Sequence, residues 1–279
     1  MKRLLILTVF FAAAAAFAAP PQRIVSTAPA FTEMLFAIGA GGQVVGVTGC
    51  CFFPPEARQR EKIGGYTDVS YEKLLSLKPD LVVTADYALR MREHCATAKF
   101  ATLELKTNSV GDILNAIEQL GRVTGHDKEA RALAGSIRGE LQAIRAASHR
   151  PPRRALLVIG RARGSFQELL SVGPGGFLDD LLSCAGGTNV LADVNQPWPR
   201  INLETVLARK PEVIIEMVGE AMGDRASANE VGGRKQEWNR FSGVPAVAIG
   251  RVNTLLSDHA LIPGPRLVDT ARVLAELLR

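Results

Sequence analysis

The chain has 279 residues and a formal net charge of +5, to which Lys2 and Arg3 contribute two. Its basic residues are scattered rather than gathered in runs, which argues against a nucleic-acid-binding protein. Four cysteines are too few for a disulfide-built scaffold, and the four histidines share no metal-site spacing. What remains is a globular chain long enough for two modest domains with their own cores.

The first 18 residues have the pattern of a cleavable export signal. Lys2 and Arg3 precede an apolar run of about fourteen residues, which is short for the alternative, a membrane anchor. Ala16 and Ala18 place small side chains where a signal peptidase reads the chain. No cysteine stands near this point, so we do not expect a lipid anchor. We therefore expect residues 1–18 to be removed, leaving an exported protein with a charge of about +3.

Residues 23–125 alternate between strand and helix patterns. Short apolar runs predict strands at 23–26, 44–47, 81–84 and near 101–105. Helical spacing of apolar residues predicts helices at 31–38, near 88–98 and at about 109–123. Such alternation is typical of a parallel sheet covered on both faces. We expect this segment to form an N-terminal α/β lobe.

A long helix is predicted at residues 127–148. Leu133, Ile137, Leu141 and Ile144 form one narrow apolar stripe, and the prolines after Arg150 end the pattern. At 1.5 Å per residue the helix would be roughly 33 Å long, enough to cross from one lobe to another. We interpret it as an interdomain helix; an ordinary surface helix of the first lobe is the alternative.

Residues 153–279 repeat the α/β pattern and are expected to form a C-terminal lobe. Strands are predicted at 155–159, 213–217 and 244–249, and a final helix at 266–278. The polar, glycine-rich stretch from Gly219 to Gly233 is expected to be a mobile loop.

Two stretches, 70–83 and 202–215, are nearly the same sequence. Both read as a short helix, a Lys-Pro stop and a buried strand, with Glu72 aligned to Glu204. An aromatic residue stands six positions before each glutamate, Tyr66 in one half and Trp198 in the other. Two copies predict two similar lobes rather than a solenoid. The cleft between two such lobes is a usual place for a small-molecule site.

The sequence carries no recognisable catalytic motif. It contains no GxSxG elbow, no GxxxxGK[ST] phosphate loop and no HExxH, so we assign no catalytic residue, no metal ligand and no catalytic cofactor. An exported metal-dependent hydrolase using Cys50, Cys51 and His94 is kept as the alternative from another class. Either Cys50 or Cys51 could form a disulfide with Cys95, whereas Cys184 has no partner in its half.

Several motifs in order along the chain resemble the vitamin B12-binding proteins of bacterial ABC importers and their relatives that bind haem and iron-siderophores. The motifs are Arg23-Ile-Val-Ser-x-Ala-Pro-Ala-x-Thr-Glu33, Val44-Val-Gly-Val-Thr48, Phe53-Pro-Pro-Glu-Ala57, Gly64-Gly-Tyr66, the first repeat, Ala185-Gly-Gly-Thr-Asn189, Pro197-Trp-Pro199 and Gly264-Pro-Arg266. The resemblance implies two Rossmann-like lobes with parallel sheets joined by one long rigid α-helix. It also implies a monomeric periplasmic substrate-binding protein, not an enzyme, that delivers a metal chelate to a permease and ATPase complex.

The resemblance assigns roles to particular residues. Glu72 and Glu204 match acids that dock onto arginines of the permease, although an acid in the first turn of a helix is also favoured by the helix dipole. Tyr66 and Trp198 match aromatics that contact the ligand, and Asp258 matches an acid that hydrogen bonds to it.

Departures from the pattern bear on the cargo. Cys50 replaces an aromatic, Ala85 a tryptophan and Ile262 an arginine of the cobalamin binders, and Ala275 stands where a disulfide partner of Cys184 would be. Tyr87 could replace the missing tryptophan. Arg161 could meet carboxylates of a haem or siderophore, and Phe166 is included among the ligand-binding residues. Cobalamin is the simplest prediction; haem, with Tyr66 as iron ligand, or an iron-siderophore is the alternative.

Overall fold

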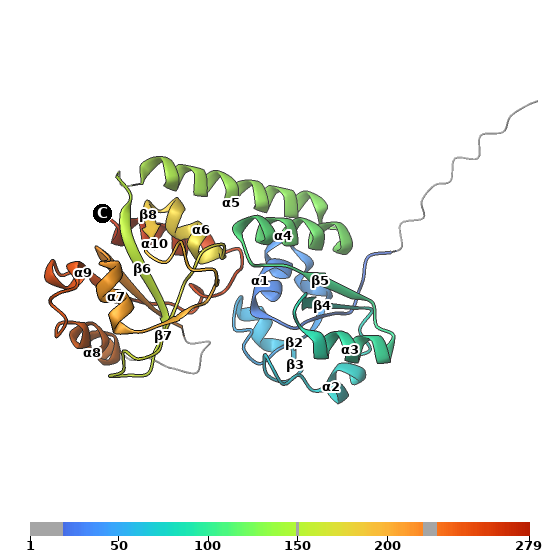
Figure 1. Ribbon diagram of the computed structural model, residues 1–279. Coiled ribbons are helices and arrows are strands. Elements are labelled where there is room, and N and C mark those ends of the chain that lie inside the picture. The colour runs from blue at the N-terminus through green and yellow to red at the C-terminus, as the bar shows by residue number, and fades with distance from the viewer. Residues whose placement is uncertain (1–18, 149–150, 220–227) are drawn as a thin grey trace, which may run out of the picture.

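The computed structural model describes residues 19–148, 151–219 and 228–279. They form two α/β lobes that lie side by side, with the long helix α5 running along both (Figure 1). We call residues 19–125 the N-terminal lobe and residues 151–279 the C-terminal lobe.

The N-terminal lobe is built on a parallel sheet with strand order β3-β2-β1-β4-β5. The central strands β1 and β4 are buried along their whole length because helices cover both faces, which explains their mostly apolar sequences. The strands are β1 (Ile24–Ser26), β2 (Val44–Val47), β3 (Glu61–Lys62), β4 (Leu81–Ala85) and β5 (Thr102–Leu105). The helices are α1 (Pro29–Ala37), α2 (Tyr71–Ser76), α3 (Leu89–Ala98) and α4 (Val110–Thr124), with the 3-10 turns η1 (Ala40–Gln43) and η2 (Pro55–Gln59).

The C-terminal lobe has strand order β11-β10-β6-β7-β9, with β8 paired to β6. Strands β8, β6, β10 and β11 are parallel, whereas β7 is antiparallel to both β6 and β9, so this sheet is mixed rather than wholly parallel. The strands are β6 (Arg153–Gly160), β7 (Leu169–Ser171), β8 (Gly187–Asn189), β9 (Arg200–Ile201), β10 (Val213–Val218) and β11 (Val252–Leu256). The helices are α6 (Phe177–Cys184), α7 (Leu203–Arg209), α8 (Ala228–Trp238), α9 (Pro245–Ala248) and α10 (Leu267–Leu277).

The sequence repeat has the same local structure in both lobes. The side chain of Ser70 caps α2 by accepting from the amide of Lys73, and Asn202 caps α7 in the same way. Each helix is followed by a lysine in the left-handed conformation, Lys78 with φ 44° and Lys210 with φ 49°. Because both copies adopt this uncommon backbone conformation, the two stretches are structural as well as sequence repeats.

The acid after each Lys-Pro pair holds the first strand of its lobe. Asp80 accepts a hydrogen bond of 2.9 Å from the amide of Arg23, just before β1. Glu212 accepts one of 2.9 Å from the amide of Arg154, at the start of β6. The repeat therefore fixes the central strand pair of each sheet.

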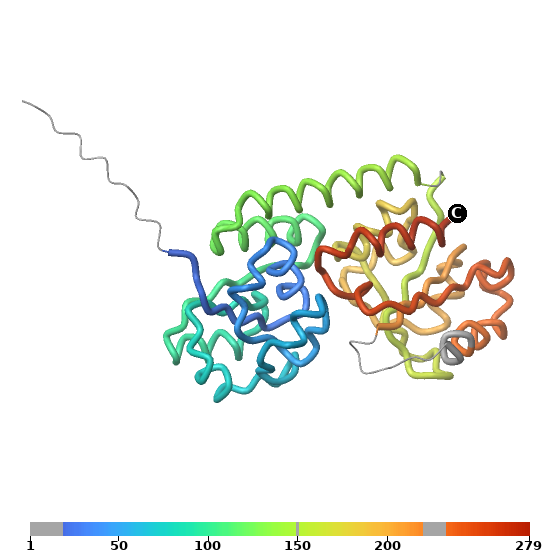
Figure 2. Tube along the Cα trace, turned by 180° about the vertical axis from the view of Figure 1, so that it is seen from behind, coloured from blue at the N-terminus to red at the C-terminus, as the bar shows by residue number. Residues whose placement is uncertain are grey.

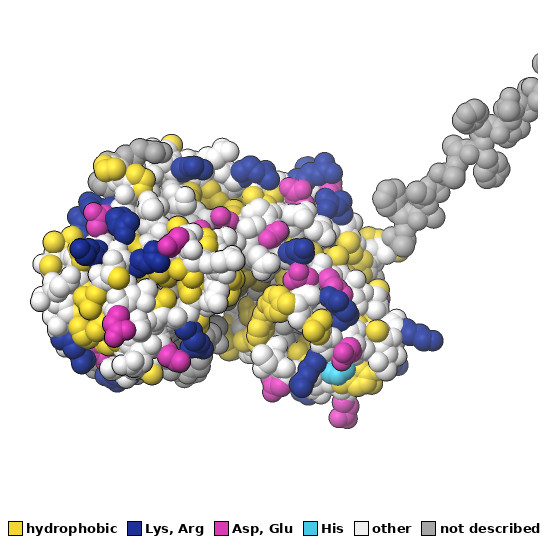
Figure 3. All heavy atoms as spheres, viewed as in Figure 1, with side chains coloured by type: hydrophobic (Ala, Val, Ile, Leu, Met, Phe, Trp, Pro, Cys, Tyr) yellow, Lys and Arg dark blue, Asp and Glu magenta, His cyan; other side chains and the backbone are white. Residues whose placement is uncertain are grey.

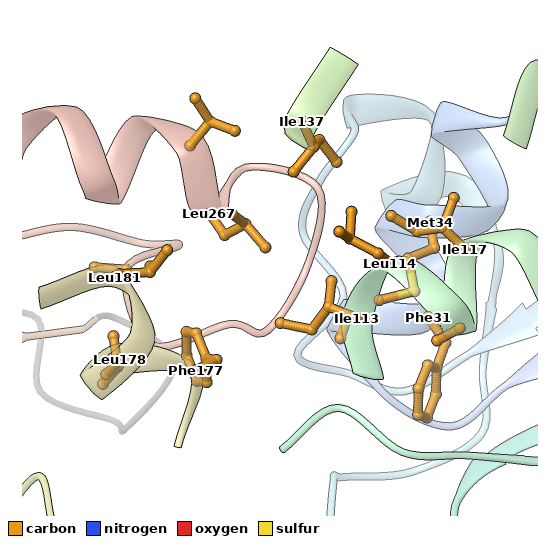
Figure 4. Close-up of a cluster of buried hydrophobic side chains, with 14 of the residues drawn as sticks. Phe31, Met34, Ile113, Leu114, Ile117, Ile137, Phe177, Leu178, Leu181 and Leu267 are labelled. Carbon is orange, nitrogen blue, oxygen red and sulfur yellow. The ribbon is translucent and has the colours of Figure 1, made fainter. Parts of the chain in front are cut away.

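Helix α5 (Asp127–Ala147) crosses both lobes, as the view from behind also shows (Figure 2). It packs on α4 of the N-terminal lobe and on α6 and α10 of the C-terminal lobe. One hydrophobic cluster continues from one lobe into the other beneath it: Figure 4 shows Met34 and Leu114 of the N-terminal lobe, Ile137 of α5, and Phe177 and Leu267 of the C-terminal lobe. The lobes thus share a core, which resists changes in their relative angle.

Three predictions need correction or fall outside the structure. Residues 244–249 are not a strand: Pro245 starts the short helix α9, and the strand at this sheet edge is β11, which pairs with β10. Cys50, Cys51 and Cys95 are free thiols, because Cys95 packs in a separate cluster under α3. The predicted loop at 219–233 lies mostly outside the described residues, and α8 begins at Ala228.

Candidate ligand-binding site

A cavity of about 240 Å³ lies between the two lobes and is lined by both. Its N-terminal wall comes from the first turn of α1 and from loops that follow strands: Ala28 after β1, Cys50 after β2, Tyr87 after β4 and Thr107 after β5. Because the strands are parallel, their carboxyl ends all meet at this edge of the sheet. Tyr66, which precedes α2, completes this wall.

The C-terminal wall of the cavity is built by the same rule. Gly219 follows β10, and Asp258 follows β11 together with an apolar turn, Leu261-Ile-Pro263. Figure 3 shows the hollow between the lobes with hydrophobic side chains in its depth. The lining is therefore largely apolar, with one carboxylate, one thiol, two phenols and the hydroxyls of Thr107 and Ser257.

Tyr66 and Tyr87 are joined across the N-terminal wall, with 2.5 Å between their hydroxyl oxygens. The pair also borders a second cavity of about 410 Å³ inside the N-terminal lobe, lined among others by Thr84 and His94. Burial, together with the hydrogen bond to Tyr87, raises the pKa of Tyr66, so its phenol stays protonated at neutral pH. The structure thus brings the two predicted aromatics together as a partition between two cavities.

Cys50 and Cys51 form a vicinal pair with unequal thiols. Cys51 is buried in the core, whereas Cys50 is half-buried and lines the cavity. A hydrogen bond from the Cys51 thiol, together with the Thr48 hydroxyl and the charge of Lys62, lowers the pKa of Cys50 to about 6. The hydrogen bond to Cys50 and burial raise the pKa of Cys51, so the more exposed thiol ionises first.

Asp258 belongs to an ion-pair network that joins the two lobes. Arg266 donates to both carboxylate oxygens of Glu33, at 3.0 and 2.6 Å, and to Asp258 at 3.3 Å. Its guanidinium also lies 4.0 Å from the centroid of the Phe53 ring. Burial raises the pKa of Asp258, but hydrogen bonding from His259 and the charge of Arg266 outweigh it and leave that pKa below its usual value. Arg266 therefore connects the carboxylate of Glu33, in the N-terminal lobe, to that of Asp258 on the cavity wall.

Arg161 and Phe166 do not lie at this cavity, contrary to prediction. The Arg161 side chain has no exposed surface and is ion-paired to Glu216 at 3.0 Å and to Glu237 at 2.5 Å. Its guanidinium covers the ring of Phe166, which packs edge-on against Trp238. Both residues belong to the core of the C-terminal lobe, and a buried guanidinium that is already ion-paired to two carboxylates is not available to those of a ligand.

Trp198 is exposed but does not line the described cavity. Its ring lies over Gly176, about 3.6 Å from where a side chain at that position would begin. The next residue, Phe177, donates its amide hydrogen to the carbonyl of Asn108 in the N-terminal lobe. The ring is thus close to the junction of the lobes and could reach only a ligand larger than the cavity itself.

The two aligned glutamates are exposed in the first turns of α2 and α7, one on each lobe. In the view of Figure 1 both helices lie below α5. Each carboxylate is therefore free of the ligand cavity and available to another surface.

Sequence reasoning assigned no role to Glu33 or Arg266. Both stood within motifs, Thr32-Glu33 and Gly264-Pro-Arg266, but they are separated by 233 residues. The motifs could have marked both residues as candidates, but only the fold shows that their side chains pair. Arg266 also supplies a cation beside Asp258, near the position where Ile262 replaces the expected arginine.

Two α/β lobes, one helix along both, and a cavity at the carboxyl ends of strands from each lobe define a two-lobed binding protein. A family model described as "Periplasmic binding protein" matches residues 24–258, and the chain belongs to this family. It is therefore a substrate-binding protein of the ABC-importer type and not an enzyme.

Individual relatives agree with this assignment. The chain is 28% identical over 268 residues to the vitamin B12-binding protein of Pectobacterium atrosepticum, covering 93% of this chain and 89% of the relative. The solved periplasmic vitamin B12-binding protein of Vibrio cholerae superposes with a TM-score of 0.77 at 25% identity, covering 94% and 98%. The periplasmic heme-binding protein of Roseiflexus sp. RS-1 has a TM-score of 0.74 at 24% identity, covering 94% and 100%, and shows the fold alone.

Two features that the described residues lack bear on the alternatives. No helix among the described residues is long and apolar enough to cross a membrane. Within the same residues, no group of three His, Cys, Asp or Glu side chains is placed to hold a metal ion. Cys50 lines the cavity between the lobes, whereas His94 lines the separate cavity of the N-terminal lobe, so the residues of the hydrolase alternative do not share one site.

Proposed function

We propose that this protein captures a metal chelate, most simply cobalamin, in the cleft between its lobes and delivers it to an ABC importer. The observation that carries the proposal is the cavity at the strand ends of both lobes, with an apolar lining and the Tyr66–Tyr87 pair. Flat chelates expose wide apolar faces, and their burial against aromatic side chains supplies most of the binding free energy.

The cavity as it stands is smaller than most ligand sites, which span roughly 300–1,000 Å³. The larger cavity lies directly behind the tyrosine pair. A chelate that turns Tyr87, which is mostly exposed, out of its hydrogen bond would gain that space. The shared core under α5 leaves local side-chain movement, rather than wide lobe closure, as the means of fitting the ligand.

Haem is the second candidate because Tyr66 offers a phenol to the cavity and haem binders share the fold. The hydrogen bond to Tyr87 and the raised pKa of Tyr66 oppose phenolate ligation in the unliganded protein. Because the phenol of Tyr66 is held in its protonated form, the site favours cobalamin, whose binding needs no phenolate.

Chelate binding by purified residues 19–279 tests the proposal. Cyanocobalamin, haemin and a ferric hydroxamate are each titrated while absorption spectra and thermal unfolding are recorded. A chelate at 100 times its Kd should raise the free energy of unfolding by about 2.7 kcal/mol. Saturable binding of one chelate supports the proposal, and no stabilisation or spectral change with any of the three contradicts it.

Delivery is proposed to use Glu72 and Glu204 as contacts for arginines of the permease, after residues 1–18 direct the protein to the periplasm. Their exposed carboxylates, one per lobe, suit a partner that spans both lobes. The variant Glu72→Gln/Glu204→Gln should bind chelate normally but fail to support uptake by its cognate importer. Glu129→Gln, which changes an exposed acid in the first turn of α5, is the matched control and should transport normally. Normal uptake by the double variant would exclude this docking role.

A further inference from the structure

We propose that Cys50 is a ligand for the metal of the cargo. Its sulfur would bind the chelated ion from the cavity wall in place of an axial water. The site would thereby select flat metal macrocycles whose axial position is exchangeable. This inference rests on the proposed function and adds a coordination bond to it.

The position of Cys50 suits this role. It follows β2 at the carboxyl edge of the sheet and lines the cavity together with Tyr66 and Tyr87. Asp258 and Ile262 lie on the opposite wall. A flat ring between the lobes would therefore present one face to the Cys50 side of the cavity.

A buried chain of hydroxyl and thiol groups stands behind the sulfur. The Thr48 hydroxyl lies 3.3 Å from the sulfur of Cys50 and 3.1 Å from that of Cys51. The Thr32 hydroxyl lies 3.2 Å from Cys51 and 2.8 Å from the hydroxyl of Ser26. The four groups behind Cys50 are fully buried, so only the sulfur at the end of the chain reaches the cavity. A thiolate at Cys50 would accept from the Thr48 hydroxyl and the Cys51 thiol, and such donors stabilise the form that binds metals.

The other ionisable groups in the described lining are already engaged. The phenol oxygens of Tyr66 and Tyr87 bond to each other at 2.5 Å. Asp258 is held by Arg266 and by His259, whose Nδ1 lies 2.9 Å from its carboxylate. In the part of the chain that the structure describes, the sulfur of Cys50 is hydrogen-bonded only to Thr48 and Cys51 behind it, so a metal can reach it from the cavity side.

Replacement of the axial water by the sulfur of Cys50 needs no redox step. Water leaves the axial position of the metal, the Cys50 thiol loses its proton to solvent, and the sulfur lone pair forms the metal–sulfur bond. Thiolate is a strong ligand for the ferric and cobaltic ions of porphyrins and corrins. A chelate whose axial positions are filled by tightly held groups, or a siderophore that saturates its iron, would gain nothing from Cys50.

Matched ligand pairs test this inference. Aquocobalamin and cyanocobalamin share one corrin and differ in whether water or cyanide holds the axial position. Haemin and metal-free protoporphyrin share one ring and differ in the metal. Wild type, Cys50→Ser and Cys184→Ser are titrated with all four; Cys184 lies at the α5–α6 contact, away from the cavity, and serves as the control.

Wild type and Cys184→Ser should bind the exchangeable member of a pair at least tenfold more tightly than its partner. They should also show a thiolate-ligated absorption spectrum, and for haemin the matching ferric paramagnetic resonance signal. Cys50→Ser should lose that preference and spectrum while it still binds cyanocobalamin or protoporphyrin, which shows that it is folded. A preference and spectrum that persist in Cys50→Ser, or are absent from wild type, would overturn the inference and leave the proposed function intact. Failure of wild type to bind any of the four would overturn both.

Discussion

Arg266 should be the most important charged side chain for holding the two lobes together. It joins Glu33, which is only 3% exposed, to Asp258 on the cavity wall, and it covers the ring of Phe53. Replacing it with alanine leaves the Glu33 carboxylate buried without its cation. Removing one partner of a fully buried pair costs about 3–5 kcal/mol. Because the Arg266 side chain is 18% exposed, we expect a somewhat smaller loss, about 2–4 kcal/mol.

This loss should be visible in thermal and chemical unfolding. For a chain of this size, each kcal/mol lowers Tm by about 2–4 °C, so Arg266→Ala should lower it by on the order of 10 °C. The double variant Arg266→Ala/Glu33→Gln should recover part of the loss, because a neutral amide is cheaper to bury than an unpaired carboxylate. Arg272→Ala is the control: its ion pairs to Glu140 and Asp269 lie half-exposed on the surface and should cost no more than about 1 kcal/mol.

The pH dependence has a definite sign. Burial raises the pKa of Glu33 despite the hydrogen bond and charge of Arg266. Without Arg266 that pKa rises further, so protonation of Glu33 at lower pH should relieve the variant. The difference in unfolding free energy between wild type and Arg266→Ala should therefore be largest near pH 7.5 and shrink towards pH 5. A loss no greater than that of Arg272→Ala, or one that grows as the pH falls, would refute the reasoning.

Two further predictions test local details. The rate at which iodoacetamide alkylates Cys50, followed by mass spectrometry, should rise with pH through a midpoint of about 6, because thiolate forms above that pKa. Burial raises the pKa of Cys184, so this control thiol should react only at higher pH. A midpoint near 9 for Cys50 would contradict the prediction. Gly121→Ala should lower the free energy of unfolding by about 1–3 kcal/mol, because the added carbon would clash with the side chain of Ala130. Gly139→Ala has open space around it and should stabilise α5 by about 0.5–1 kcal/mol. Urea unfolding measures both, and equal effects would show that the α4–α5 contact is looser than described.

The sequence predicted those features that rest on local pattern. The apolar stripe from Leu133 to Ile144 indicated α5, and the structure places it on both lobes. Cys50, Tyr87 and Asp258 meet at one cavity because each follows a parallel strand, a consequence of topology that the strand assignments already contain.

Other features depend on pairings that no local pattern reveals. The apolar run at 244–249 resembles a buried strand, but Pro245 fits the first turn of a helix, and the more polar Asn253-Thr254 segment forms the strand instead. Arg161 follows a strand as a ligand-binding residue could. Only the fold shows that Glu216, 55 residues later, neutralises it in the core.

The central claim is that the cleft between the lobes holds a flat metal chelate. A crystal structure of residues 19–279 with the chelate that binds in titration tests it most directly. We predict a ring lying between Cys50 and Tyr66 on one wall and Asp258 on the other, with Tyr87 turned away from Tyr66 to admit it. A chelate bound elsewhere, with the Tyr66–Tyr87 hydrogen bond intact and the cleft empty, would contradict the account.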